Sequence, residues 1–346
     1  MMTSRERCCK ALQRETPDRV PTFEYAIDKK VVDHFCPGGE YADVVEALEL
    51  DGITAWEPSM GGYAKGLPDR SAGDLFVDEW GVSREVTVEM SAFPMEEDAP
   101  IRSSADLSNY SPPDPDLPDR YATLTEYVQR FKGQKLISYC IVDMFETTKC
   151  LLGFKHFLIS STQDTELVDR TYAMVTDWII EVARNAADLG ADMIIVNGDL
   201  GFKTGTFLHP RSLHAIHIPR LRTVTEAIKD RRAYMFYHSH GNIWRVLDQI
   251  VGTGVDVVHP LAPEDQMDIS IVKKIFGHRV AVAGNISTDL LSRATEEEVE
   301  RVTRKTIEET APEGGYILMA GSSIHSGVKP ENYKKMVDTT HRYGRY

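Results

Sequence analysis

The sequence lacks the features of membrane, secreted and nucleotide-binding proteins. No apolar run approaches the roughly 18–20 residues of a membrane span, and the first residues contain no apolar segment typical of a secretory signal. The five cysteines are an odd number without a CxxC pair, which favours a reduced, cytoplasmic setting. No GxGxxG or GxxxxGK[ST] follows an expected strand, and no GxSxG occurs, so an open nucleotide-binding sheet and a serine hydrolase are disfavoured.

Positive charge is also scarce. The 346 residues include 53 Asp and Glu but only 39 Lys and Arg, which gives a formal net charge of −14. Phosphate backbones and anionic lipid surfaces are bound by clustered cations. We therefore expect neither a nucleic-acid partner nor a membrane partner.

What the sequence does contain is an alternation of short apolar runs and amphipathic segments. After residue 190, five such runs are separated by expected helices, and they span residues 191–196, 234–238, 255–260, 279–284 and 316–320. Continuous apolar runs are typical of strands buried on both faces, and the alternation predicts right-handed βαβ units in a parallel sheet. An open doubly wound sheet and a closed barrel both satisfy the pattern. Polar residues gather just after the strands, which favours an α/β fold of the (β/α)8 TIM barrel type.

The first third of the chain is less regular and is expected to form an N-terminal extension of that barrel. Residues 4–15 predict a short helix, and residues 20–25 (VPTFEY) predict a first strand. Residues 74–90 have the alternation of a β-hairpin, and the proline-rich segment 111–120 predicts a connection. We expect a single barrel domain over residues 1–346, with the N-terminal helix and the β-hairpin insertion within residues 1–120.

The tripeptide His238-Ser239-His240 is the most distinctive motif. It follows an expected strand in the sequence YHSHGN, which runs from Tyr237 to Asn242. Alternate side chains of an extended segment share a face, so both imidazoles can reach one metal ion, and Zn²⁺ accepts such ligands. In the alternative interpretation, one imidazole packs inside the protein and the other faces solvent. We expect Tyr237 and Asn242 to contact substrate.

Carboxylates follow two other expected strands. Asp199 lies between Gly198 and Gly201, where it can serve as an acid or base, a metal ligand or a substrate anchor, or can simply cap a turn. Glu146, with Asp143 before it, leads into a helix, where the helix dipole alone also favours a carboxylate. We take Glu146 and Asp199 as candidate catalytic residues.

After the last expected strand, the segment AGSSIHSG places Ser322 and His325 near the same face of the sheet. We expect both residues to contact substrate.

Taken together, these segments resemble the uroporphyrinogen decarboxylase superfamily, which also contains corrinoid-dependent methyltransferases. The resemblance covers nearly the whole chain and is strongest after residue 140. It is carried by SRERCCKALQRETPDRVP, MFETTKCLLG, GDLGFKTGTFLHPRSL, HSHGN, GVDVVHPLAP, VAGNIST, GGYILMAGSSI and KPEN. The resemblance implies a (β/α)8 barrel whose site lies at the carboxyl ends of the strands.

The details are more similar to the methyltransferase branch, which includes methylcobalamin:coenzyme M methyltransferases and O-demethylase components. The decarboxylases open with an arginine-rich segment that binds substrate carboxylates, whereas no arginine follows Arg19 in the corresponding stretch here. In the methyltransferases, zinc is typically held by a His-x-Cys pair and a distant cysteine. His238 matches the first ligand, His240 replaces the first cysteine, and Ser322 replaces the second.

The expected function is therefore zinc-dependent methyl transfer between a small methylated substrate and a corrinoid (cobalamin) carried by a partner protein. Two imidazoles and a carboxylate form a harder site than thiolates do, which favours oxygen as the reacting atom, as in a methyl ether or an alcohol. The alternatives are a uroporphyrinogen decarboxylase and a catalytically inactive relative that only binds a ligand.

Overall fold

The computed structural model describes residues 2–59, 71–87 and 92–346, and its centre is a parallel sheet. The strands pair in the order β1-β5-β6-β9-β10-β11-β12. Their bounds are β1 (Gly52–Trp56), β5 (Leu136–Val142), β6 (Met193–Asn197), β9 (Tyr234–His238), β10 (Val257–His259), β11 (Ala281–Ile286) and β12 (Tyr316–Ala320). All six neighbouring pairs run parallel, as the alternation of strands and helices predicts.

The sheet has seven strands in the described residues, so the full eight-stranded barrel expected from the sequence is not confirmed. The segment predicted as a first strand lies beside the free edge of β12 instead. Thr22 forms a single parallel bridge with Leu318, and the Thr22 carbonyl accepts a hydrogen bond from the amide of Asp51, just before β1. This segment therefore lies between the two edge strands without forming a regular strand, which gives a curled sheet of the TIM-barrel kind.

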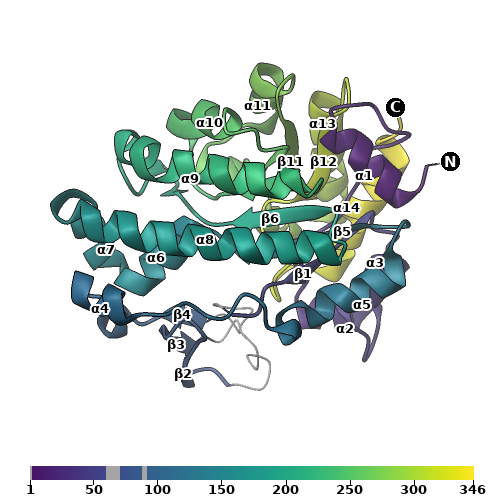
Figure 1. The fold of residues 1–346 in the computed structure, drawn as a ribbon. Coiled ribbons are helices and arrows are strands. Elements are labelled where there is room, and N and C mark those ends of the chain that lie inside the picture. The colour runs from purple at the N-terminus through teal and green to yellow at the C-terminus, as the bar shows by residue number, and fades with distance from the viewer. Residues whose placement is uncertain (1, 60–70, 88–91) are drawn as a thin grey trace.

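Helices cover the outer face of the sheet and connect its strands, with α8 and α9 running alongside it (Figure 1). They are α5 (Ala122–Phe131), α6 (Met144–Leu152), α7 (Phe154–Gln163), α8 (Thr165–Leu189), α9 (Pro210–Asp230), α10 (Trp244–Val251), α11 (Ile269–Phe276), α12 (Thr288–Arg293), α13 (Glu296–Thr310) and α14 (Pro330–Tyr343). The long α8 ends at Gly190, which adopts the left-handed conformation that glycine permits. Among the described residues, no helix has the length and apolar character to cross a membrane.

The N-terminal third contributes α1 (Ser4–Leu12), α2 (Lys29–Phe35), α3 (Tyr41–Ala47) and α4 (Ser104–Asn109). The expected hairpin is present as β2 (Leu75–Val77) and β3 (Ser83–Val86), joined by β4 (Ala92–Pro94) in a small antiparallel sheet. The last residues of that predicted hairpin, 88–90, lie outside the described residues. A second hairpin, β7 (Gly201–Phe202) with β8 (Gly205–Thr206), follows β6.

The inward-facing side chains of the strands form their own apolar cluster. It consists of alternate strand residues together with side chains of α1 and of the segment before β1, among them Cys8, Leu12, Phe23, Leu136, Cys140, Met193, Ile195, Phe236, Val257, Ala283 and Met319. Because side chains alternate across a strand, His238 faces inward like Phe236, whereas Tyr237 faces the helices. The interior is therefore mostly apolar, apart from the hydrogen-bonded hydroxyls of Thr54 and Ser138, and the polar side chains of the candidate site lie at the carboxyl ends of the strands.

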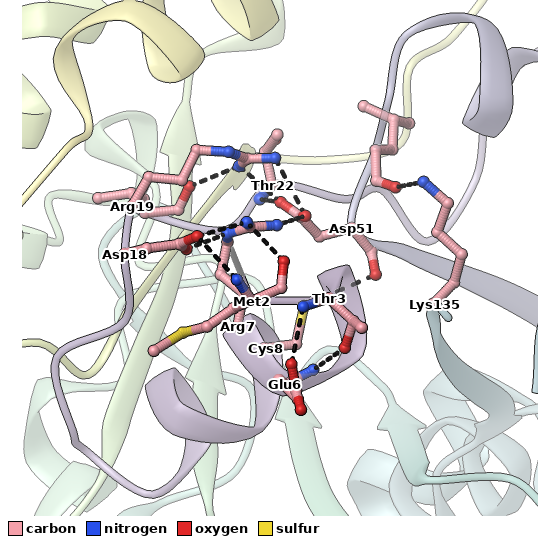
Figure 2. Close-up of polar contacts among 12 residues, drawn as sticks. Met2, Thr3, Glu6, Arg7, Cys8, Asp18, Arg19, Thr22, Asp51 and Lys135 are labelled. Carbon is pink, nitrogen blue, oxygen red and sulfur yellow. Dashed lines mark hydrogen bonds and ion pairs between the residues drawn. The ribbon is translucent and has the colours of Figure 1, made fainter. Parts of the chain in front are cut away.

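At the opposite end of the sheet, a buried ion-pair network joins α1 to the start of β1 (Figure 2). The fully buried Asp51 carboxylate accepts hydrogen bonds from Arg7 Nη1 at 2.7 Å, from Arg19 Nη1 at 2.7 Å and from the amide of Thr22 at 2.9 Å. Arg7 also pairs with Asp18 at 2.6 Å. One carboxylate thus compensates two guanidinium groups in a buried setting.

Replacing Asp51 by alanine should strongly destabilise the protein. Both arginines would lose a buried counter-charge, and breaking a buried pair typically costs about 3–5 kcal/mol. The free energy of unfolding measured in urea should fall by that amount, whereas Lys10→Ala, which breaks an exposed pair with Glu15, should change it by less than about 1 kcal/mol. Equal effects of the two substitutions would contradict this role for Asp51.

A second stability prediction concerns His217 of α9, which is fully buried with Nε2 2.9 Å from the Tyr237 hydroxyl. Burial lowers its pKa to about 3, with a further contribution from the charge of Arg220. The unfolded chain titrates near pH 6.5, so between these values it binds a proton that the folded chain does not, and stability falls as the pH falls.

From about pH 7 to about pH 5, His217 should therefore account for a loss of about 2 kcal/mol in the free energy of unfolding. His217→Gln should remove that part of the pH dependence in denaturant titrations at the two pH values. The exposed His278→Gln serves as the control and should behave like the wild type. An unchanged pH dependence in His217→Gln would show that His217 is not held neutral.

Candidate functional site at the carboxyl ends of the strands

Three neighbouring strands place polar side chains at one level of the sheet. In the strand register, Asn197 of β6 is opposite His238 of β9, and His238 is opposite His259 of β10. Both histidines are buried directly above the apolar interior, and the ring of Tyr25 contacts them edge-on, with centroids at 5.4 and 5.6 Å. The ends of the strands thus form a polar layer on an apolar core.

His238 and His259 form a hydrogen-bonded pair, with their Nδ1 atoms 2.7 Å apart. His259 Nε2 lies 3.1 Å from the carbonyl oxygen of Ala320, which can only accept, so we assign the proton to that nitrogen. His259 Nδ1 is then an acceptor, and His238 Nδ1–H donates to it. Burial lowers the pKa of both histidines, that of His259 to about 3, which keeps the pair neutral. His238 Nε2 consequently has a free lone pair.

His240 is held by a different partner. Its Nδ1 lies 3.1 Å from Asp265 Oδ2, which also accepts a hydrogen bond from the amide of Gly241 at 2.9 Å. Asp265 belongs to the short 3-10 helix η5 (Pro263–Asp265) after β10. Burial lowers the pKa of His240, but the hydrogen bond to Asp265 and the charge of Asp199 outweigh it, so the pKa is raised overall.

Asp199 brings the two histidines into one cluster. Its Oδ1 accepts the amide hydrogen of His240 at 3.0 Å and lies 3.7 Å from His238 Nε2. The rings of His238 and His240 are 5.1 Å apart between centroids. The Asp199 side chain is 46% exposed, so a ligand can reach it. The structure thus brings together His238, His240 and Asp199, as the sequence predicts.

Two further carboxyl groups, those of Asp143 and Glu146, lie beside this cluster at the start of α6. Asp143 caps the helix by accepting the amide hydrogen of Glu146 at 2.7 Å, while its Oδ2 is buried without a hydrogen-bond partner. Burial raises the pKa of Asp143 to about 7, and the charges of Glu146 and Asp199 add to the shift. Glu146 pairs with Lys149 at 2.6 Å, and burial raises its pKa as well. Burial thus favours the protonated form of Asp143, whereas Glu146 also has the Lys149 ammonium as a partner.

The adjoining loop needs glycine for a steric reason. A Cβ atom at Gly198 would lie 2.1 Å from the Asp143 carboxyl, which leaves no room for a side chain between the two segments. This close approach allows the loop that carries Asp199 to pack against the start of α6.

The donor chemistry of the cluster fits a cation in part. Two ligands of one tetrahedral zinc ion lie roughly 3.3–3.6 Å apart, close to the 3.7 Å between His238 Nε2 and Asp199 Oδ1. Two lone-pair donors facing each other without a hydrogen between them suit a positive charge. In residues 2–59, 71–87 and 92–346, however, no three His, Cys, Asp or Glu side chains are grouped as metal ligands. The zinc site therefore stays a prediction that lacks a third ligand in place.

The other predicted substrate contacts are more scattered. The buried Tyr237 directs its hydroxyl to His217 on the helix side of the sheet. The backbone N–H of Asn242 donates to the backbone carbonyl of Phe202 in the β7–β8 hairpin. Ser322 lies beside the hydroxyl of Tyr25. His325 is exposed and accepts the amide hydrogen of Gly327 at 3.1 Å. Ser322 thus adjoins the histidine pair through Tyr25, whereas Tyr237 faces the helix layer, and substrate contact by these four residues stays a prediction.

The sequence places His259 among the polar residues that follow the strands but assigns it no role, and it gives no indication that Tyr25 or Asp265 belongs to the site. His259 follows a strand, which was the available signal, but its pairing with His238 depends on the register of β9 and β10. Asp265 lies in a loop, and nothing in its local pattern indicates a histidine partner.

Comparisons with known proteins agree with this architecture. The profile of the family described as uroporphyrinogen decarboxylase (URO-D) matches residues 73–343. A uroporphyrinogen decarboxylase of Pseudoalteromonas atlantica is 26% identical over 263 residues, which cover 70% of each chain. One of Myxococcus xanthus is 26% identical over 308 residues, 88% of this chain and 77% of its own length.

Solved structures show the same fold at lower identity. A methyltransferase from Methanosarcina mazei superposes with a TM-score of 0.73 over 99% of both chains at 16% identity. A B12-independent methionine synthase from Shewanella sp. W3-18-1 reaches 0.50 over 95% of this chain and 96% of its own, at 10% identity. These two likenesses concern the fold alone. The profile match over most of the chain shows that the protein belongs to the uroporphyrinogen decarboxylase (URO-D) family.

Proposed function

We propose that the chain is a methyltransferase that moves a methyl group between a small substrate methylated on oxygen, a methyl ether or an alcohol, and a corrinoid on a partner protein. The observation that carries this proposal is the charge of the site. The side chains around the strand ends include the neutral imidazole of His238 and the carboxyl groups of Asp143, Glu146 and Asp199. Such a site suits an uncharged substrate that needs a proton or a cation at oxygen.

The same charge disfavours the decarboxylase alternative. A tetrapyrrole with many carboxylates needs unpaired cations in its cleft. Three cations near this end of the sheet are each paired: Lys149 with Glu146, the buried Arg84 with Asp78, and the buried Arg120 with Glu57 and Glu79. Their charges are therefore already compensated within the protein.

An aromatic surface next to Glu146 and Lys149 supports a substrate with an apolar body. The ring of Phe207 lies 5.2 Å from that of Phe154 and 5.5 Å from that of Phe202, and Lys149 Nζ lies over Phe154 at 5.5 Å. Phe154 and Phe202 are both partly exposed. A methoxyaromatic ring could stack on this surface with its ether oxygen toward the carboxyls.

Transfer of the methyl group breaks a carbon–oxygen bond and leaves an alkoxide or a phenolate, which must gain a proton. Glu146, which pairs with Lys149, is the candidate group to supply this proton, because burial raises its pKa and so favours its protonated form. Asp143 lies fully buried nearby, and the negative charge of Glu146 adds to the burial that raises the pKa of Asp143. Asp199 faces the leaving oxygen from the histidine side.

Two groups that the protein would bind complete the proposal. A corrinoid in its Co(I) state, when bound on the partner, supplies the nucleophile that accepts the methyl group. Zinc, held by His238 and Asp199 with His240 as the third ligand, would supply a Lewis acid for the ether oxygen. For that role His240 would have to move relative to Asp265 or bind through Nε2.

The proposed function predicts methyl transfer to cob(I)alamin. The reaction can be monitored through the absorbance change that accompanies formation of methylcobalamin. With methoxyaromatic donors the wild type should show turnover, and Glu146→Gln should slow it about 100-fold or more, because general acid assistance is lost. Glu181→Gln, on the exposed face of α8, is the matched control and should retain full activity. Absence of transfer from methoxyaromatics, methanol and methylamines would refute the proposal, and coproporphyrinogen formation from uroporphyrinogen would assign the decarboxylase instead.

The proposed function also predicts that the protein binds a zinc ion through His238. Elemental analysis of protein dialysed against zinc should give about one ion per chain, and His238→Ala should abolish binding because the best-oriented lone pair is removed. The exposed His278→Ala should leave the zinc content unchanged. Wild-type protein without zinc would refute the metal site, and full zinc in His238→Ala would refute the ligand assignment.

A further inference from the structure

His259 is buried beneath the open carboxyl end of the curled sheet, called the mouth below, and it is hydrogen-bonded to His238. It is 1% exposed and lies between the ring of Phe236, at 5.3 Å between centroids, and that of Tyr25. Both of its nitrogens are engaged, one with His238 and one with Ala320. A buried histidine with two fixed partners has only one tautomer that satisfies both.

The Ala320 carbonyl decides which tautomer that is. With Nε2 protonated, His259 donates to this carbonyl and accepts from His238, so both ring nitrogens of His259 form hydrogen bonds. In the reversed arrangement, His259 Nε2 and the carbonyl oxygen would be two acceptors 3.1 Å apart in an apolar layer. That arrangement is disfavoured because a buried acceptor would lose its hydrogen bond.

The position of the Ala320 carbonyl is itself fixed by the contacts of that residue. Ala320 pairs with Ile286 at the end of β12, and its amide donates to the buried Glu24 carboxyl at 2.9 Å. The chain of contacts therefore runs from Glu24 through Ala320 and His259 to His238. At its far end, His238 Nε2 faces Asp199 at 3.7 Å with no hydrogen to share.

We propose that His259 is a positioning residue that locks His238 in the tautomer with Nδ1 protonated, so that Nε2 presents its lone pair to the mouth. The inference rests on the proposed function only in that His238 Nε2 is the atom that meets the substrate or its activating cation. The tautomer itself is a property of the protein alone, before any substrate, metal or corrinoid binds.

The test uses full-length, metal-free protein labelled with ¹⁵N-histidine. Two-bond proton–nitrogen correlation spectra distinguish protonated from unprotonated ring nitrogens, and His238→Gln assigns the His238 signals. In the wild type, His238 should show an unprotonated Nε2 and a protonated Nδ1. A protonated Nε2 in this spectrum overturns the proposal, whatever the activity.

Three variants separate positioning from packing. His259→Phe keeps a ring without an acceptor and should shift His238 toward the Nε2-protonated form that a free imidazole favours in water. His259→Asn keeps an acceptor near the Nδ1 position and should preserve the wild-type tautomer. His217→Phe removes a different buried histidine, bonded to Tyr237 rather than to His238, and should also preserve it. An unchanged His238 tautomer in His259→Phe overturns the proposal.

Kinetics connect the tautomer to methyl transfer. His259→Phe should lower kcat about 10–100-fold with little change in KM, and His259→Asn should recover most of the loss. If the tautomer shifts as expected but the wild type transfers no methyl group to any acceptor, the positioning role stands and the proposed function fails. If the wild type is active and His259→Phe keeps full activity with a shifted tautomer, the role of His259 in the reaction is overturned.

Discussion

The site depends on one hydrogen bond between two neutral imidazoles at the boundary between a packed interior and the open end of the sheet. Below His238 and His259 the inward-facing side chains are apolar, so no water is available to satisfy a misplaced proton. Burial lowers the pKa of both rings, and a charged pair would face the same desolvation cost twice. The protein therefore holds two bases in their uncharged form and uses a backbone carbonyl to direct their protons. This arrangement gives His238 a free lone pair.

Burial has the opposite effect on the pKa of the carboxyl groups on the other side of the mouth. Asp143 is buried like the histidines, but for an acid burial raises the pKa, to about 7 here. The charges of Glu146 and Asp199 raise the pKa of Asp143 further. This end of the sheet thus combines imidazole lone pairs on one side with a carboxyl on the other side, Asp143, whose protonated form is favoured by burial. This separation of base and acid is what cleavage of a bond to oxygen requires, because the leaving atom gains charge as the methyl group departs.

Much of the fold is readable from the sequence because strand burial depends on local patterns. The apolar run predicted at residues 234–238, for example, matches β9 residue for residue. The clustering of Asp199 with the HSH motif also follows, because parallel strands end at one edge. The hydrogen bond between His238 and His259 cannot be predicted from the sequence, since it depends on which strand lies beside β9 and on the register between β9 and β10. Nor can the contact of His240 with Asp265, which a loop conformation creates. The strand predicted at residues 20–25 is not seen as a regular strand for a similar reason. The segment is apolar enough, but it forms hydrogen bonds with β12 and with the start of β1 at isolated positions only.

At the two ends of the sheet, several arginines that the structure describes are held by carboxylates of the protein itself. Arg19, the last arginine before the segment that would carry substrate-binding cations, pairs with Asp51 at the start of β1. The mouth begins six residues later at Glu57, and an extended strand advances about 3.3 Å per residue, so this arginine lies roughly 20 Å from the site. Arg7 is held in the same network, and Arg120 at the mouth is itself bound to Glu57. These arginines stabilise the fold at fixed carboxylates within the protein. Substrate carboxylates would have to displace those partners at the cost of leaving buried charges unpaired, which an uncharged methyl donor does not require.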